Sequence, residues 1–99
     1  MKKGEKMDIK HVEGKDVGKI FLYAISTCAW CRKTKRLLND LGLDYYYVDV
    51  DLLDEDKKKK AKEEVKKWNP QCSFPTLVIN DEKYIIGFDE KEIKGIVEK

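Results

Sequence analysis

Hydrophobic and polar positions follow two periods along the chain, and the changes of period predict strands and helices in turn. Residues 19–25 (KIFLYAI) form a nearly continuous apolar run of strand length, which is typical of a strand buried on both faces. Apolar residues then recur at steps of three and four over residues 29–41, which predicts a helix, and Gly42 stands where many helices end. Residues 43–50 (LDYYYVDV) predict a second strand.

The second half of the chain predicts two more helices and a hairpin. Acidic residues at 54–56 open a lysine-rich helix, at the end where the helix dipole favours negative charge. Residues 76–79 (TLVI) and 84–86 (YII) are short β-rich runs close enough to form a hairpin. Residues 89–98 predict a final helix. The side chains expected to face inward from it are those of Ile93, Ile96 and Val97.

The resulting order, β-α-β-α-β-β-α, indicates an α/β fold. A right-handed crossover makes the first two strands parallel, and the hairpin completes a four-stranded mixed sheet flanked by helices. Ile9 and Val12 flank a polar stretch that predicts an extra N-terminal edge strand. We therefore expect an N-terminal extension over residues 1–17, polar over residues 1–7, and one domain over residues 18–99.

Composition narrows the class of protein. The chain has 99 residues, of which 41% are hydrophobic and 40% charged, so a single globular domain is expected rather than disorder. The formal net charge of only +2 argues against a nucleic-acid partner. No apolar stretch approaches the roughly 20 residues of a membrane span, and the N-terminus lacks the apolar region of a secretory signal. These features predict a cytoplasmic protein without membrane contact, and nothing demands more than a monomer.

Two close cysteines carry the candidate chemistry. Cys28 and Cys31 form a Cys-x-x-Cys pair where the first long strand gives way to the first helix, the edge at which α/β sheets usually place their chemistry. In an intracellular chain this spacing indicates a redox couple or half of a metal site. With Cys28 at the helix N-cap, the free N–H groups of the first turn favour its thiolate, which is the attacking species in disulfide exchange. Cys31, one turn deeper, is expected to keep its proton.

That asymmetry predicts a mechanism. Cys28 attacks a substrate disulfide to form a mixed disulfide, and Cys31 then attacks Cys28 and releases the reduced substrate. The couple needs no cofactor beyond the two thiols. The alternative is that both cysteines are simply small buried side chains of the core.

Three motifs in the same order resemble the glutaredoxin family. They are Thr27-Cys28-Ala29-Trp30-Cys31, Ser73-Phe74-Pro75-Thr76 and Ile86-Gly87-Phe88-Asp89. The resemblance runs from about Lys19 to Glu98, and it implies a thioredoxin fold with a cis Phe74–Pro75 bond beside the dithiol. It also implies that Cys28 is the nucleophile and Cys31 the resolving thiol. The substrate-binding residues that it implies are Thr27, Ala29, Trp30, Phe74, Pro75, Gly87, Phe88 and Asp89.

Departures from the family pattern weaken glutathione binding. Ala29-Trp30 replace the usual Pro-Tyr, and Ile25 stands where the family usually has a Lys or Arg that meets a glutathione carboxylate. Phe88 replaces the second of two glycines, and Asp89 adds negative charge. We therefore expect a reductant protein, either a thioredoxin reductase or a ferredoxin-linked disulfide reductase, and disulfide-containing proteins as substrates. The alternatives are a glutathione-dependent glutaredoxin and an iron–sulfur or metal carrier that uses the same cysteines.

Other residues allow two interpretations each. Cys72 is either an accessory thiol near the proline loop or a small, partly buried side chain. Trp30 either contacts a partner protein or shields the disulfide. His11 could complete a zinc set with the three cysteines, but the second close ligand pair of most structural sites is missing, so no metal site is expected. The lysine run at 57–60, with Lys62, Lys66 and Lys67, is expected to be a solvated helix face.

Overall fold

A mixed sheet of five strands forms the centre of the molecule, in the order β1-β3-β2-β4-β5. The computed structural model describes residues 9–98. The strands are β1 (Lys10–Val12), β2 (Ile20–Ala24), β3 (Tyr45–Asp49), β4 (Thr76–Ile79) and β5 (Lys83–Ile86). The helices are α1 (Ala29–Asp40), α2 (Glu55–Trp68) and α3 (Glu90–Gly95), with 3₁₀ turns η2 (Val50–Leu52) and η3 (Ile96–Glu98). The predicted α/β class and element order are confirmed, and the predicted N-terminal edge strand is β1.

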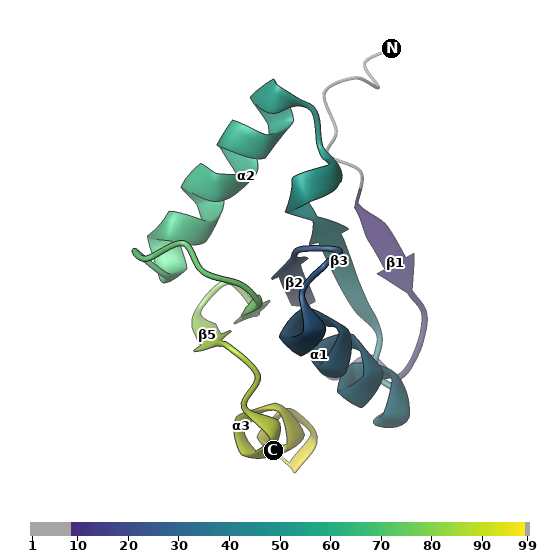
Figure 1. Ribbon diagram of the computed structural model, residues 1–99. Helices are drawn as coiled ribbons and strands as arrows, with labels where there is room; N and C mark the ends of the chain where they lie inside the picture. Colours follow the sequence, from purple (N-terminus) through teal and green to yellow (C-terminus); the bar gives the residue numbers. More distant parts are fainter. Residues whose placement is uncertain (1–8, 99) are drawn as a thin grey trace.

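The central strand β2 is buried on both faces because its side chains alternate between two cores. Leu22 and Ala24 lie in the core beneath α1 and α3, whereas Tyr23 lies in the core beneath α2. Figure 1 shows α2 on one side of the sheet and α1 with α3 on the other. Both cores therefore press on the strand that leads into the Cys-x-x-Cys pair, and they fix its end in place.

Pairing within the sheet brings four chain segments to one edge. β2 and β3 are parallel, with Ala24 opposite Asp49, so their carboxyl ends lie side by side. β4 is antiparallel to β2, with Tyr23 opposite Thr76, and so begins at that edge. β5 is antiparallel to β4, with Thr76 opposite Ile86, and so ends there. The loops that follow β2, β3 and β5 and the loop that precedes β4 all meet at this edge, which we call the dithiol edge.

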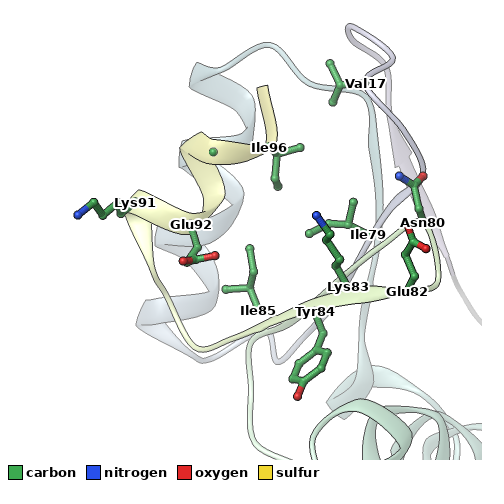
Figure 2. Close-up of a pocket in the computed structure, with 11 residues that line it drawn as sticks. Val17, Ile79, Asn80, Glu82, Lys83, Tyr84, Ile85, Lys91, Glu92 and Ile96 are labelled. Carbon is green, nitrogen blue, oxygen red and sulfur yellow. The ribbon is translucent and has the colours of Figure 1, made fainter. Parts of the chain in front are cut away.

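The hairpin side of the molecule shows the same alternation. Figure 2 shows Ile85 of β5 directed toward α3 and Tyr84 directed to the opposite side, where its ring lies 6.0 Å from that of Trp68. A hollow of about 450 Å³ lies between β5 and α3, walled by Ile79, Ile85 and Ile96. It sits at the turn between β4 and β5, at the end of the sheet opposite the dithiol edge.

Two expectations at the chain ends have different outcomes. Val97 was expected to face inward and is 38% exposed, so that prediction is wrong. The helix gives way after Gly95 to the tighter 3₁₀ turn η3, whose three residues per turn carry Val97 away from the core that holds Ile93 and Ile96. The expected polar segment 1–7 lies outside the described residues.

Among the described residues, no helix is long and apolar enough to cross a membrane.

Candidate active site

Cys28 is the N-cap of α1, as predicted. Its backbone is extended, with φ −89° and ψ 121°, and its Sγ accepts a hydrogen bond of 3.2 Å from the backbone N–H of Cys31. An N-cap side chain normally supplies an oxygen to these free N–H groups, and here a sulfur takes that role. Cys28 is half-buried, so its thiol sits at the surface with a backbone donor on the side of the helix.

Cys31 is fully buried one turn further into α1. Its Sγ accepts a hydrogen bond of 3.4 Å from the backbone N–H of Ile25, at the end of the preceding strand. Burial, followed by the hydrogen bond with Cys28, raises the pKa of the Cys31 thiol to about 12. All three cysteines are free thiols in this structure. The pair thus consists of an accessible thiol and a protected thiol that keeps its proton, the asymmetry that disulfide exchange requires.

The loop before β4 lies beside the dithiol. The Phe74–Pro75 peptide bond is cis, as the family resemblance implied. The carbonyl oxygen of Pro75 accepts a hydrogen bond of 2.8 Å from the backbone N–H of Gly87, which ties this loop to the end of β5. Gly87 has φ +80°, a conformation that favours glycine, and a Cβ there would meet no atom within 4 Å. The conformation, and not lack of space, therefore explains the glycine.

An aromatic pair covers one side of the first turn of α1. The Trp30 ring is 55% exposed and stacks on Phe88, with centroids 5.9 Å apart and planes 26° from parallel. The Lys33 amine lies 4.8 Å from the centroid of the Trp30 ring. Phe88 is half-buried and packs against the core beneath α1 and α3. Side chains from the first and third motifs are thus in direct contact.

The remaining residues of the predicted site flank this centre. Thr27 and Ala29 are exposed on either side of Cys28, and Phe74 packs against both cores. The Asp89 carboxylate is the N-cap of α3 and accepts a hydrogen bond of 3.2 Å from the backbone N–H of Glu92. Asp89 therefore has a clear structural role, whatever it contributes to binding.

Cys72 and His11 take part in separate contacts. The Cys72 thiol lies 3.9 Å from the carbonyl oxygen of Lys62 in α2, so its nearest hydrogen-bonding partner lies in that helix. His11 Nε2 lies 2.9 Å from a carboxylate oxygen of Asp44, and its ring stacks on Tyr46. Within residues 9–98, no three His, Cys, Asp or Glu side chains are grouped so that they could hold a metal ion.

Sequence reasoning missed an anchor of the loop that carries Cys28. The Asp51 carboxylate accepts two hydrogen bonds from Ser26, of 2.8 Å from its backbone N–H and 2.6 Å from its hydroxyl. Arg32 donates to the carbonyl oxygen of Ser26 at 3.3 Å. The available signal was the parallel pairing of the first two strands, which brings an acid just after one strand to the loop just after the other. These contacts hold the chain two residues before the nucleophile.

We expect Asp51→Asn to destabilise the fold by about 1 kcal/mol at neutral pH, since hydrogen bonds to a charged acceptor are lost. Burial acts to raise the pKa of Asp51, but the hydrogen bonds from Ser26 outweigh it, so this pKa lies below its ordinary value of 3.8. Because the pKa of Asp51 is lower in the folded than in the unfolded protein, its ionisation stabilises the fold at pH values above the unfolded pKa. This stabilisation is lost as the pH falls through the folded-state pKa. Urea unfolding of both proteins at pH 7 and about pH 3 measures this, and the difference should shrink in acid.

The matched control is Asp40→Asn, at the exposed end of α1. This change removes the same charge and should alter the free energy of unfolding by less than about 0.5 kcal/mol. An Asp51→Asn protein as stable as the wild type at pH 7 would contradict the role given to the anchor.

The fold and the site together define a thioredoxin-fold protein with a Cys-x-x-Cys pair at a helix N-terminus, next to a cis-proline loop. The Glutaredoxin family model matches residues 20–85, two thirds of the chain. The chain therefore belongs to the glutaredoxin family.

Individual relatives agree with this assignment. The chain is 36% identical over 80 residues to a glutaredoxin-like 8.6 kDa protein in the rubredoxin operon of Clostridium pasteurianum, covering 81% of this chain and 99% of that protein. Methanoredoxin of Methanosarcina acetivorans has 53% identity and a TM-score of 0.84, over 87% of this chain and 90% of that one. A glutaredoxin from Methanosarcina mazei Go1 has 55% identity and a TM-score of 0.83, over 88% and 84%. The predicted family and thioredoxin fold are confirmed.

Proposed function

We propose that this protein is a thiol-disulfide oxidoreductase that reduces protein disulfides with the Cys28–Cys31 dithiol. One observation carries the proposal: an accessible thiol at a helix N-cap, with a backbone donor at its sulfur, adjoins a buried thiol whose pKa is raised to about 12. Membership of the glutaredoxin family supports the same activity.

In the first step, the Cys28 thiolate attacks one sulfur of the substrate disulfide. A bond forms between Cys28 and that sulfur, the substrate S–S bond breaks, and the other substrate sulfur leaves as a thiolate. In the second step, Cys31 loses its proton and attacks the Cys28 sulfur, which releases the second substrate thiolate. Two electrons pass from the dithiol to the substrate, the substrate sulfurs take up the protons, and the protein is left with a Cys28–Cys31 disulfide.

Several features support a reductase protein as the electron donor in place of glutathione. Ile25 offers no charge at the position where the family usually has a Lys or Arg that meets a carboxylate of glutathione. The stacked rings of Trp30 and Phe88 cover the area that a second glycine would leave open. Asp89 places a negative charge beside it. The donor class that we propose is a thioredoxin reductase or a ferredoxin-linked disulfide reductase in the cytoplasm.

A redox titration tests the function. The protein is equilibrated in dithiothreitol buffers of defined potential, its thiols are alkylated, and the modified cysteines are identified by mass spectrometry. We expect a reversible two-electron change confined to Cys28 and Cys31, with Cys72 alkylated at every potential. The midpoint ranks the candidate donors, because each 30 mV corresponds to about 1.4 kcal/mol. If Cys28 pairs with Cys72, or if no reversible disulfide forms, the proposed function is wrong.

A further inference from the structure

A cavity of about 620 Å³ lies at the dithiol edge, between α2 and the loop that precedes β4. One wall is apolar and comes from Ile25, Val50 and Phe74. Another wall is a row of lysines from α2, and Asp51, Cys72 and Ser73 complete the lining. The cavity is therefore lined by both apolar and cationic side chains.

The lysines of this wall are Lys58, Lys62 and Lys66, spaced four residues apart so that they share one face of α2. Among residues 9–98, no carboxylate lies within 4 Å of the amines of Lys62 and Lys66. The one acidic residue in the lining is Asp51, and both of its oxygens accept hydrogen bonds from Ser26. The Glu55 carboxylate lies 4.0 Å from the Lys58 amine, and the charge of Asp51 also acts on Lys58, so the excess positive charge of the cavity rests on Lys62 and Lys66.

The lysine run in the sequence divides between two environments. Lys58 is half-buried and lines the cavity together with the exposed Lys62 and Lys66, whereas Lys59 and Lys60 are exposed and do not line it. Lys62 and Lys66, expected on a solvated helix face, are exposed there and also line the cavity. This division also supplies control positions with the same charge on the same helix.

The cavity adjoins the path that a substrate would take. Ser73 and Phe74 form part of its wall and immediately precede Pro75 at the dithiol edge. A substrate segment that lies along these residues with its cysteine on Cys28 brings the residues next to that cysteine over the cavity. A glutamate there would set its methylene groups against the apolar wall and its carboxylate against the lysines.

We propose that this cavity, which we call the lysine cavity, binds acidic side chains next to the reactive cysteine of protein substrates. The inference rests on the proposed function and adds a substrate class to it: disulfides flanked by Glu or Asp. A carboxylate here would meet the exposed amines of Lys62 and Lys66, so salt should weaken its attraction to the cavity.

The test uses symmetric disulfides of short synthetic peptides. One peptide has two glutamates before its cysteine and another has two after it, and each is matched by a version with glutamines. The rate constant for reduction by the pre-reduced protein is measured at low salt and divided by the rate constant with dithiothreitol, which corrects for intrinsic reactivity. For at least one placement of the acids, we expect the glutamate peptide to react about five- to tenfold faster, equivalent to about 1 to 1.4 kcal/mol.

Matched variants locate the effect. Lys62→Glu with Lys66→Glu should bring the glutamate-to-glutamine ratio below one, whereas Lys59→Glu with Lys60→Glu, the same change of net charge, should leave it unchanged. The inference would be overturned if the glutamate and glutamine peptides react equally fast with the wild type. It would also be overturned if both double variants lose the preference to the same extent. The inference would also be overturned if the peptides show no preference while the Lys62→Glu, Lys66→Glu variant loses reactivity with glutathione disulfide. The cavity would then bind a small thiol compound and not a protein substrate. A folded, reduced wild type that reacts with none of the disulfides overturns the proposed function as well.

Discussion

Cys28→Ser is expected to lower the rate of disulfide reduction by at least about a thousandfold, because a serine hydroxyl cannot replace the attacking thiolate. Cys28 is the accessible thiol of the pair, and its sulfur receives the N–H of Cys31 at 3.2 Å. The buried Cys31, with its pKa raised to about 12, is both shielded and protonated at neutral pH. The measurement is the reduction of a protein disulfide, followed by alkylation of the released thiols.

Cys72→Ser is the matched control for this prediction. Cys72 is also a half-buried free thiol, but its sulfur lies 3.9 Å from the Lys62 carbonyl oxygen of α2. Its replacement should leave the rate of reduction of a disulfide without acidic neighbours within about twofold of the wild type, as expected for a substitution away from the reacting atoms. Full activity of Cys28→Ser together with loss of activity in Cys72→Ser would exchange the roles of the two residues, and the proposed mechanism would be wrong.

The sequence predicted the elements that depend on strong local patterns. β2 was recognisable because burial on both faces requires an unbroken apolar run, and α1 because its buried residues Cys31, Thr34 and Leu38 recur at steps of three and four. The cap of α1 was also predictable, since the Cys-x-x-Cys spacing at a strand end leaves Cys28 at the first free N–H groups. Here local preference and tertiary packing agree.

The structure differs from the sequence-based prediction where a short-range pattern competes with tertiary contacts. Val97 continues the apolar spacing of the last helix, but the chain tightens into η3 after Gly95 and the pattern loses its register. The contact of Asp51 with Ser26 spans 25 residues, so no local window of sequence contains both partners. Such contacts follow from the parallel pairing of β2 with β3, which fixes the edge but leaves open which side chains meet.

Some parts of the candidate site could be predicted from the sequence and others could not, for the same reason. The dithiol and the cis-proline loop could be inferred from motifs, because each motif is compact in the sequence. The stack of Trp30 on Phe88 and the lysine cavity could not, because each joins elements that are far apart along the chain. The stack involves two residues, Trp30 and Phe88, at which the chain departs from the usual family pattern, so specificity toward electron donors is expected to lie there.

Cys31→Ser is expected to stop turnover with a reductase protein, by about a hundredfold or more, while leaving the first attack intact. Without the resolving thiol, the mixed disulfide between Cys28 and the substrate has no intramolecular route to release, so it should accumulate. Serine is close in size to cysteine, and its hydroxyl can still accept the N–H of Ile25, so the fold should persist. Mass spectrometry of the unreduced reaction should show one substrate molecule attached per protein, at Cys28.

The same variant distinguishes the two electron donors. Glutathione can resolve a mixed disulfide from outside, so a glutathione-dependent protein would keep its turnover after Cys31→Ser when glutathione is supplied. A protein that depends on the internal dithiol would not. The Trp30–Phe88 pair and the Asp89 carboxylate favour this second result, because the family resemblance implies that they cover and charge the place where glutathione binds. Restored turnover with glutathione would therefore replace the proposed reductase by glutathione, while the role of Cys28 as nucleophile would stand.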